Sequence, residues 1–337
     1  MANIDEMNKN EWSVDVIIPV YQPTEGLFLL LEQLEKQTVH CHQVILINTG
    51  KEYFEQLMAD LDSNSDSDSQ EQQNRRTWFN ELLHTGWVKL EHIEKKDFDH
   101  GHTRNVACAL SNSDFFVMMT DDAIPEDNTL LEKLLAPFAD TSVAMTYARQ
   151  LPASDCHTIE RFTRAFNYPV QSQIKASADL CIIGIKAFFA SNVCAAYRRE
   201  IFDSLNGFID HTIFNEDMIY ARGVLDAGYR IAYVAEACVV HSHNYSGSAQ
   251  LKRNFDLGVS HAMHPEIFAD LATESEGIRL VFKTCGHLFH IHKPWLIFKL
   301  FWQSGCKYIG YFLGKRYQHL PKGMVRRCSM NREYWDK

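Results

Sequence analysis

Strand-like apolar runs alternate with helix-like segments along the first part of the chain. Residues 14–21 form a β-branched apolar run, and leucines at helical spacing follow it from Leu27 to Leu34. Two more strand-like runs cover residues 43–47 and 88–93. Strands that alternate with helices in this way predict a mostly parallel sheet with helices on both faces. We therefore expect an α/β fold.

Polar side chains stand where several of these runs end. Tyr21 ends the first run, Asn48 follows the second, and Asp121 and Asp122 follow the apolar run 115–119. In open α/β sheets, ligands bind beyond the carboxyl ends of the strands. These positions therefore predict a crevice of nucleotide size along that edge of the sheet.

The adjacent carboxylates of Asp121 and Asp122 are the strongest chemical signal in the chain. Two neighbouring carboxylates repel each other and are costly to desolvate, so a cation between them and a ligand is favoured. A divalent metal ion that holds a diphosphate fits this pattern. The alternative is that both residues cap a helix that begins near Glu126.

A second polar segment, residues 98–105, precedes the helical run 106–110. Backbone N–H groups at a helix start, supplemented by Arg104, predict an anion site, because arginine holds phosphate oxygens with directed donors. The alternative is that Arg104 pairs with a neighbouring carboxylate.

Two acidic residues, Glu216 and Asp217, open a predicted helix that stops near Gly228. Such charges favour the helix dipole, so capping alone is one interpretation. A strand-like run follows, and after it come His241 and His243, one residue apart. Because a carboxylate pair and the histidines occur in the same chain, one of the histidines is a candidate to complete a metal site.

In this order, the motifs resemble those of the family 2 glycosyltransferases, which are inverting enzymes with the GT-A nucleotide-diphospho-sugar fold, and among them the bacterial rhamnosyltransferases. The resemblance covers residues 14–245 and extends more weakly to Trp335. The segments that carry it are 16–21, 98–105, 120–125, 189–192, 214–218 and 240–245.

The resemblance implies a divalent metal cofactor, Mg²⁺ or Mn²⁺, that neutralises the departing diphosphate. Its ligands would be Asp122 with Asp121, completed by His241 or His243. Many relatives carry a spaced Asp-x-Asp where this chain has two adjacent aspartates. The motif therefore leaves open which of the two carboxylates binds the metal.

The remaining site residues are also assigned by resemblance. Asp217 matches the general base that takes the proton of the acceptor hydroxyl, and Glu216 lies beside it to orient the acceptor. His100 and Asn192, with Glu216, are placed at the acceptor or the transferred sugar. Donor binding is assigned to Pro19, Tyr21, Asn48, Arg104 and Asp121.

For substrates, the resemblance implies transfer of L-rhamnose from dTDP-rhamnose to a hydroxyl of a polysaccharide or a lipid-linked oligosaccharide. Asn48 stands where many relatives carry an aspartate near the base, which leaves the base selectivity open. A UDP-sugar donor is the alternative. Two other classes stay open: a metal-dependent hydrolase and a non-catalytic saccharide-binding protein. We expect no nucleic acid partner.

Composition predicts a cytoplasmic protein. With 337 residues and 46% hydrophobic residues, the chain can form one large α/β domain with an appendage. Its nine cysteines form no Cys-x-x-Cys pair, which favours free thiols in a reducing compartment. Residues 1–13 are polar, so we expect an N-terminal tail and no signal peptide. No apolar run reaches the roughly 18 residues that a membrane span needs.

We expect the catalytic domain to cover residues 14–278, with a mobile polar insertion at 62–74, and a helical region at 279–337. Residues 279–332 hold 11 Lys or Arg and no Asp or Glu, whereas residues 1–278 hold 21 basic and 41 acidic residues. The basic region is also rich in aromatic residues.

Basic and aromatic residues on short helices predict a peripheral contact with an anionic membrane, here the inner face of the cell membrane. The alternative is that the aromatic residues pack against the acidic domain or against a second subunit in a homodimer.

Overall fold

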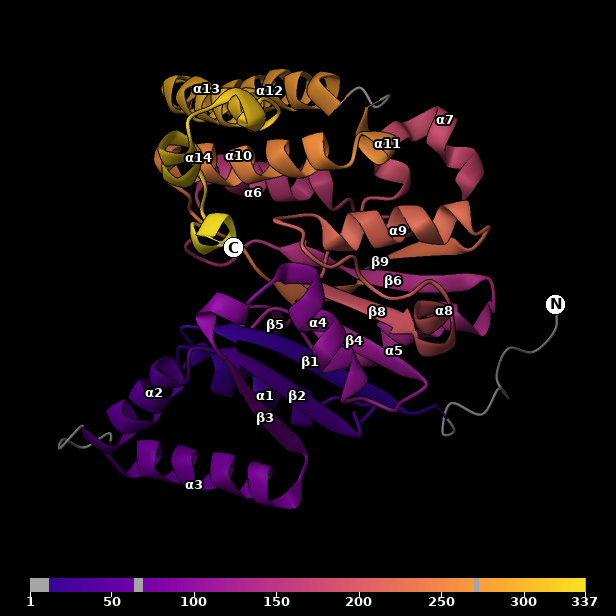
Figure 1. Cartoon of the computed structure of the whole chain (residues 1–337), viewed down its shortest axis with the longest axis vertical. Coiled ribbons are helices and arrows are strands. Elements are labelled where there is room, and N and C mark those ends of the chain that lie inside the picture. Colours follow the sequence, from indigo (N-terminus) through magenta and orange to yellow (C-terminus); the bar gives the residue numbers. More distant parts are fainter. Residues whose placement is uncertain (1–11, 64–68, 270–272, 337) are drawn as a thin grey trace.

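The computed structural model describes residues 12–63, 69–269 and 273–336 (Figure 1). Within these residues the strands are β1 Val14–Tyr21, β2 Gln43–Thr49, β3 Val88–Ile93, β4 Phe115–Met119, β5 Ile124–Pro125, β6 Val143–Leu151, β7 Gln173–Lys175, β8 Cys194–Arg198 and β9 Arg230–Val240.

All the described strands join one sheet in the order β3-β2-β1-β4-β8-β6-β9-β5, and β7 also pairs with β9. Strands β1 to β4 run parallel to one another, as predicted. The sheet becomes mixed at β8, which is antiparallel to both β4 and β6. The run from residue 230 continues as one strand to Val240, with a register shift against β6 at Ala148 and Arg149.

The central strands are buried on both faces, which explains their continuous apolar runs. In β1, Val16 and Ile18 face one core while Ile17 faces the other, because side chains alternate along a strand. Figure 1 shows the helices that cover the two faces. Their bounds are α1 Gly26–Glu35, α2 Lys51–Ser63, α3 Ser69–Thr85 and α5 Leu130–Leu135 around the first core, and α4 His100–Ala109, α8 Arg199–Ser204, α9 Glu216–Asp226 and α11 Pro265–Phe268 around the second.

The polar stretch 62–74 is more regular than we expected. Helix α2 runs to Ser63 and helix α3 begins at Ser69, while residues 64–68 lie outside the described part of the chain. Glutamine, glutamate and arginine are good helix formers, and Phe79 of α3 is fully buried in the first core. Burial of one face is therefore enough to order a helix whose N-terminal half has no apolar residue.

A third layer of helices, with α10 Gly247–Met263, α12 Thr273–His290 and α13 Leu296–Gly314, lies above the sheet in Figure 1. The boundary expected between residues 278 and 279 falls inside α12, so these helices form one layer that starts with α10. Helices α6 Thr158–Asn167, α7 Leu180–Ile183 and α14 Lys322–Cys328 complete the set. Among the described residues, no helix combines the length and apolar character needed to cross a membrane.

Glycines bring α10 and α13 into close contact. A Cβ atom on Gly310 would lie 2.1 Å from the carbonyl oxygen of Leu251, and one on Gly314 would lie 2.1 Å from that of Phe255. These distances exclude any side chain at either position. The two helix backbones therefore touch directly, and this contact fixes the position of α13 relative to α10.

Candidate functional site

The turn that carries Asp121 and Asp122 does not begin a helix. Strand β5 follows it, and helix α5 starts only at Leu130 with Thr129 at its N-cap. The capping alternative for these two aspartates is therefore wrong. The antiparallel pairing of Ile124 with Val240 instead places the turn beside the end of β9.

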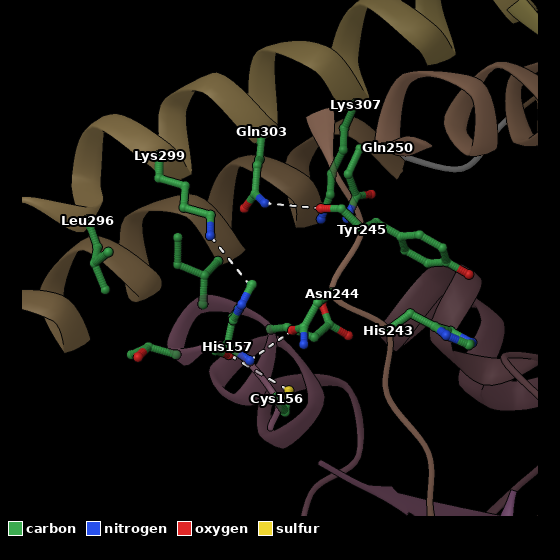
Figure 2. A pocket seen from close by; sticks show the side chains of 13 residues that line it. Cys156, His157, His243, Asn244, Tyr245, Gln250, Leu296, Lys299, Gln303 and Lys307 are labelled. Carbon is green, nitrogen blue, oxygen red and sulfur yellow. Dashed lines mark hydrogen bonds between the residues drawn. The ribbon is translucent and has the colours of Figure 1, made fainter. Parts of the chain in front are cut away.

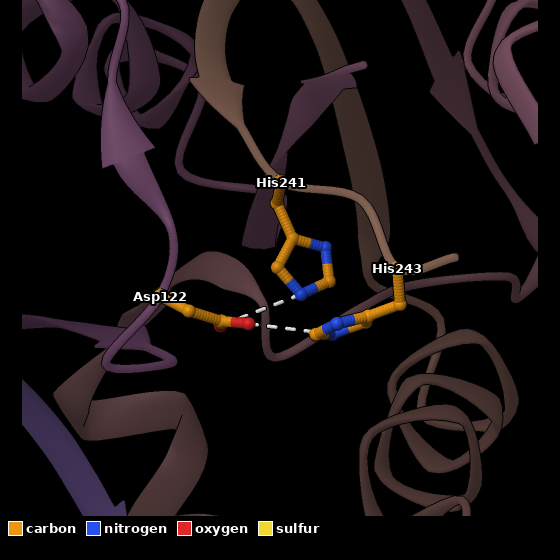
Figure 3. A group of neighbouring side chains, drawn as sticks. All are labelled: Asp122, His241 and His243. Atoms are coloured by element: carbon orange, nitrogen blue, oxygen red, sulfur yellow. Dashed lines mark ion pairs between the residues drawn. The ribbon is translucent and has the colours of Figure 1, made fainter. Parts of the chain in front are cut away.

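Asp122, His241 and His243 form a cluster at this point (Figure 3). Asp122 Oδ1 lies 3.4 Å from His241 Nε2, and Asp122 Oδ2 lies 3.3 Å from His243 Nε2. One ligand atom from each residue lies within 4.8 Å of the others, a spacing that one metal ion can bridge. Both histidines thus point at the same carboxylate, and Asp121 is not a member of the cluster.

Gln150 fixes the orientation of His241. Its Oε1 lies 3.2 Å from His241 Nδ1 and also accepts a hydrogen bond from Arg164, while its Nε2 donates to Ser191 Oγ at 3.1 Å. Because an amide oxygen only accepts, His241 Nδ1 carries a proton, and Nε2 is the ring atom that faces Asp122. We did not predict Gln150, although its place at the carboxyl end of β6 was a signal.

The two aspartates differ in their electrostatic environment. Burial and the charge of Asp122 raise the pKa of Asp121 to about 7. Burial also disfavours the charge on Asp122, but the hydrogen bond and charge of His241 outweigh it and hold that pKa below its usual range. Burial lowers the pKa of His243 to about 4, so its ring is neutral near pH 7. The cluster therefore holds an ionised carboxylate and a neutral imidazole, the forms that bind metals.

The second acidic pair opens α9, and a buried ion pair neutralises its first member. Asn215 precedes the helix in the left-handed region with φ of 67°. Glu216 is buried, lies 3.3 Å from Arg104 Nε, and accepts a hydrogen bond from Asn192 Nδ2 at 3.1 Å. Burial opposes the charge on Glu216, but Arg104 and His100 lower its pKa.

Asp217 is the more accessible member of the pair. Its Oδ2 accepts a hydrogen bond from the backbone N–H of Asn192 at 3.0 Å, and its Oδ1 accepts one from Met218 at 2.8 Å. Burial and the neighbouring charge of Glu216 raise the pKa of Asp217. A half-buried carboxylate with a raised pKa is able to take a proton from a bound hydroxyl.

Asn192 connects the two carboxylates, with its side chain on Glu216 and its backbone on Asp217. Tyr197 donates a hydrogen bond to Asn192 Oδ1 at 2.5 Å, which holds the amide in place. Asn192 thus forms a hydrogen bond with each of the two carboxylates. Tyr197, which we did not predict, supports it from the core.

Residues 98–105 connect the start of helix α4 to a distant loop. Helix α4 begins at His100, earlier than expected. Asp99 caps it by accepting from the N–H groups of Gly101 and His102. A Cβ on Gly101 would lie 1.7 Å from Ile209 O, and Asn105 exchanges hydrogen bonds with the backbone of Phe208. The segment therefore clamps the loop that leads to α9.

Arg104 lies inside α4, where it contacts Glu216 and donates to the carbonyl oxygen of His100 at 2.8 Å. This confirms the alternative of pairing with a carboxylate, and the guanidinium does not sit at an open helix start. His100 is half-buried, and burial lowers its pKa.

The positions assigned to the donor lie at the ends of β1 and β2. Tyr21 is 43% exposed and is accessible to a ligand, while Pro19 is half-buried inside β1. Asn48 is fully buried, donates to Gly50 O at 2.9 Å, and lies 3.0 Å from His92 Nδ1. Asn48 therefore stabilises the turn after β2. The half-exposed side chain of Tyr21, at the end of β1, is the one that a ligand can contact.

Comparison with known proteins gives consistent results. The model of "Glycosyl transferase family 2" matches residues 15–205. The chain is 35% identical over 326 residues, 96% of each chain, to the O-antigen chain rhamnosyltransferase RfbN of Salmonella typhimurium. It is 43% identical over 246 residues, 72% of this chain and 78% of the other, to the O-antigen chain rhamnosyltransferase WbaN of Salmonella anatum.

Solved structures share the fold. The mannosyltransferase PcManGT from Pyrobaculum calidifontis, in complex with GDP-Man and Mn²⁺, has a TM-score of 0.52 at 15% identity, covering 96% of this chain and 85% of that one. S. aureus TarS in complex with UDP-GlcNAc has a TM-score of 0.51 at 14% identity, covering 94% and 84%. The expected GT-A fold, with helices at its C-terminal end, is confirmed.

Proposed function

The chain belongs to glycosyl transferase family 2, and from this premise we propose that it transfers L-rhamnose from dTDP-rhamnose to a hydroxyl of an O-antigen saccharide. The observation that carries the proposal is the match along 96% of the chain to a relative named a rhamnosyltransferase. The dTDP nucleotide rests on the resemblance of the motifs. The acceptor is a polysaccharide or a lipid-linked oligosaccharide.

The geometry supports an inverting transfer with Asp217 as general base. The acceptor oxygen attacks the anomeric carbon from the face opposite the diphosphate, a new C–O bond forms, and the bond to the diphosphate oxygen breaks. Asp217 takes the hydroxyl proton, since it is the accessible carboxylate with the raised pKa. Glu216 is held by Arg104 and Asn192 and orients the acceptor.

We propose that Asp122, His241 and His243 hold the divalent cation. Their donor set of one ionised carboxylate and two imidazoles fits Mn²⁺ better than Mg²⁺, which prefers oxygen ligands and several waters. A bound cation would neutralise charge on the departing diphosphate. Asp121, beside the cluster and close to the end of β1, is then free to contact the donor together with Tyr21.

The donor is tested by product analysis with purified full-length protein, Mn²⁺ and an O-antigen saccharide acceptor. We expect dTDP-rhamnose, but not UDP-sugars, to raise the thermal unfolding temperature and to yield a new rhamnoside detected by mass spectrometry. Release of free rhamnose alone in the presence of acceptor would identify a hydrolase. Binding of the saccharide without any turnover would identify a saccharide-binding protein.

Asp217→Asn should reduce transfer by about 10² to 10⁴-fold, because the amide keeps the shape of the side chain but cannot accept the proton. Binding of dTDP-rhamnose should be unchanged. The matched control is Asp226→Asn at the exposed end of the same helix, which should retain full activity. If Asp217→Asn keeps more than about a tenth of wild-type turnover, then Asp217 is not the base.

The same assignment predicts a pH dependence. The base works only when ionised, and its pKa lies above the ordinary aspartate range, so kcat/KM should fall as the pH is lowered through that raised pKa. The acid limb of the profile should therefore lie above pH 4 to 5. A profile that is flat down to about pH 4 would contradict the assignment.

Metal removal should abolish transfer, and Asp122→Ala should weaken Mn²⁺ binding by more than about tenfold, because the carboxylate is the ligand that both histidines face. Mn²⁺ affinity is measured by paramagnetic resonance, with His241→Ala and His243→Ala tested separately. His264→Ala, which pairs with Glu266 away from the cluster, serves as the control. Full activity in excess chelator would contradict the metal assignment.

We also propose that α12 and α13 attach the protein to the cytoplasmic face of an anionic membrane. The side chains of Phe298, Phe301 and Trp302 are 83%, 58% and 69% exposed. They recur at helical spacing on one side of α13, and on α12 the side chain of Phe282 is 73% exposed. Tyr311 of the same helix packs within the chain, where it contacts His261. The aromatic face formed by Phe298, Phe301 and Trp302 stays exposed.

The charge distribution favours a lipid partner for this face. Residues 279–332 carry only positive charges, and each basic residue near an anionic surface contributes about 1 kcal/mol. Exposed tryptophan and phenylalanine side chains insert at the headgroup boundary. We therefore expect reversible attachment. Added salt should weaken the electrostatic attraction of the basic residues but not the insertion of the aromatic side chains.

Co-sedimentation with liposomes should rise with anionic lipid content and fall with added salt. Phe298→Ser with Trp302→Ser should remove the part that resists salt, while Leu29→Ser, at an exposed apolar residue of α1, should not. Equal recovery with neutral and anionic liposomes would contradict the proposal. So would no recovery together with a dimer in solution that the double variant disrupts, because the aromatic face would then be a subunit interface.

A further inference from the structure

A cavity of about 300 Å³ lies between the catalytic sheet and the third layer of helices (Figure 2). Its walls are the start of α6, the segment that follows β9, and one side of α13. Figure 2 shows Lys299 extending from α13 toward His157 and Gln303 extending toward Tyr245, with Lys307 beside Gln303. No step of the proposed transfer uses this space.

The wall formed by α13 is cationic. Lys299, Gln303 and Lys307 are spaced by four residues, so they lie on the same side of the helix. Lys299 Nζ lies 3.5 Å from His157 Nδ1. Lys307 is half-buried, makes no hydrogen bond or ion pair with the part of the chain that the structure describes, and has a pKa lowered by burial.

The carboxylate that lines the same cavity does not compensate for this charge. Glu160 accepts a hydrogen bond from Arg164 Nε at 2.8 Å, so it is already neutralised by a partner on its own helix. The cationic side chains of Lys299 and Lys307 are therefore left for another anion. Burial disfavours the charge on the half-buried Lys307, the charge of Glu160 offsets only part of this cost, and an anionic ligand would reduce it further.

The wall formed by the start of α6 adds hydrogen-bond donors. Helix α6 begins at Thr158, and His157 at its N-cap supplies no side-chain hydrogen bond to the first turn. The backbone N–H of His157 instead donates to Asn244 Oδ1 at 2.9 Å, which ties the start of α6 to the segment after β9. The first residues of α6 line the cavity together with the two lysines, and a helix start favours negative charge.

The position of the cavity identifies which substrate can reach it. His243 is both a wall of the cavity and a member of the cluster with Asp122. Of the residues assigned to the donor, Pro19, Tyr21 and Asn48 lie at β1 and β2, on one side of β4, whereas β6 and β9 lie on the other side. An occupant would therefore lie next to the reaction centre and away from the nucleotide.

We propose that this cavity binds the phosphate or diphosphate group of a lipid-linked acceptor, an inference that rests on the proposed glycosyl transfer. Helix α13 presents Lys299 and Lys307 to the cavity and Phe298 and Trp302 to the outside. A lipid held at the aromatic face can thus place its anionic group between the two lysines. The saccharide attached to that group would then extend toward Asp217.

The binding test uses inorganic pyrophosphate in excess EDTA, so that the metal cluster cannot take up the anion. We expect calorimetry to detect binding to the full-length protein, at least about tenfold weaker in Lys307→Gln and restored in part by Lys307→Arg. Lys293→Gln, an exposed lysine outside the cavity, is the matched control. Absence of binding to the wild type, or equal binding by Lys307→Gln, would overturn the proposal. Unchanged unfolding temperatures show that the variants fold.

A second experiment separates this inference from the transfer itself. The KM for a diphosphate-linked acceptor should rise about tenfold or more in Lys307→Gln, while the KM for the same saccharide without the diphosphate should change little. Equal changes for both acceptors would overturn the proposal and leave the transferase assignment intact. If the wild type transfers to neither acceptor, the proposed function fails, and pyrophosphate binding still decides whether the cavity is an anion site.

Bulk membrane lipid is the other source of phosphate groups. Vesicles that contain an isoprenyl diphosphate should compete with pyrophosphate, and vesicles of phosphatidylglycerol alone should not. Equal competition by both would assign the cavity to ordinary headgroups and overturn the acceptor proposal.

Discussion

The buried ion pair between Arg104 and Glu216 is the interaction on which the rest of the site depends. Two adjacent carboxylates at a helix start repel each other, and one of them is buried. Arg104 compensates the charge of Glu216, which leaves Asp217 as the accessible carboxylate whose pKa is raised. The loss of Arg104 would leave an uncompensated buried charge, which is strongly destabilising.

Much of the surrounding structure serves to hold that arginine in place. Asp99 caps helix α4, Gly101 lets the helix approach the loop before α9, and Asn105 fixes that loop through its backbone. Asn192 then connects Glu216 with Asp217 from the side of β8. Segments that are far apart in the chain thus converge on one pair of carboxylates.

The third layer of helices joins this centre to the proposed membrane contact. The direct backbone contact of α10 with α13, made possible by Gly310 and Gly314, sets the distance between these two helices. That distance leaves the cavity next to His243, while the opposite side of α13 stays exposed. One helix therefore lines the cavity on one side and carries the aromatic face on another.

The sequence by itself determined the strands, their burial and the chemistry available at their ends. Continuous apolar runs such as residues 14–21 predicted strands buried on both faces, and the family motifs pointed to Asp122, Asp217 and the two histidines. These signals are local, because they depend on side-chain spacing and on the residues directly after a strand.

Only the tertiary structure decided how these residues are paired. It pairs Arg104 with Glu216, places Asp121 outside the cluster of Asp122, His241 and His243, and forms a helix from the polar stretch around residue 69. The partner of a charge depends on contacts between distant segments, and no local spacing encodes them. For the same reason the cavity lined by Lys299 and Lys307 has no signature in the sequence: its walls come from the start of α6, the segment after β9 and α13, which meet only in the folded chain.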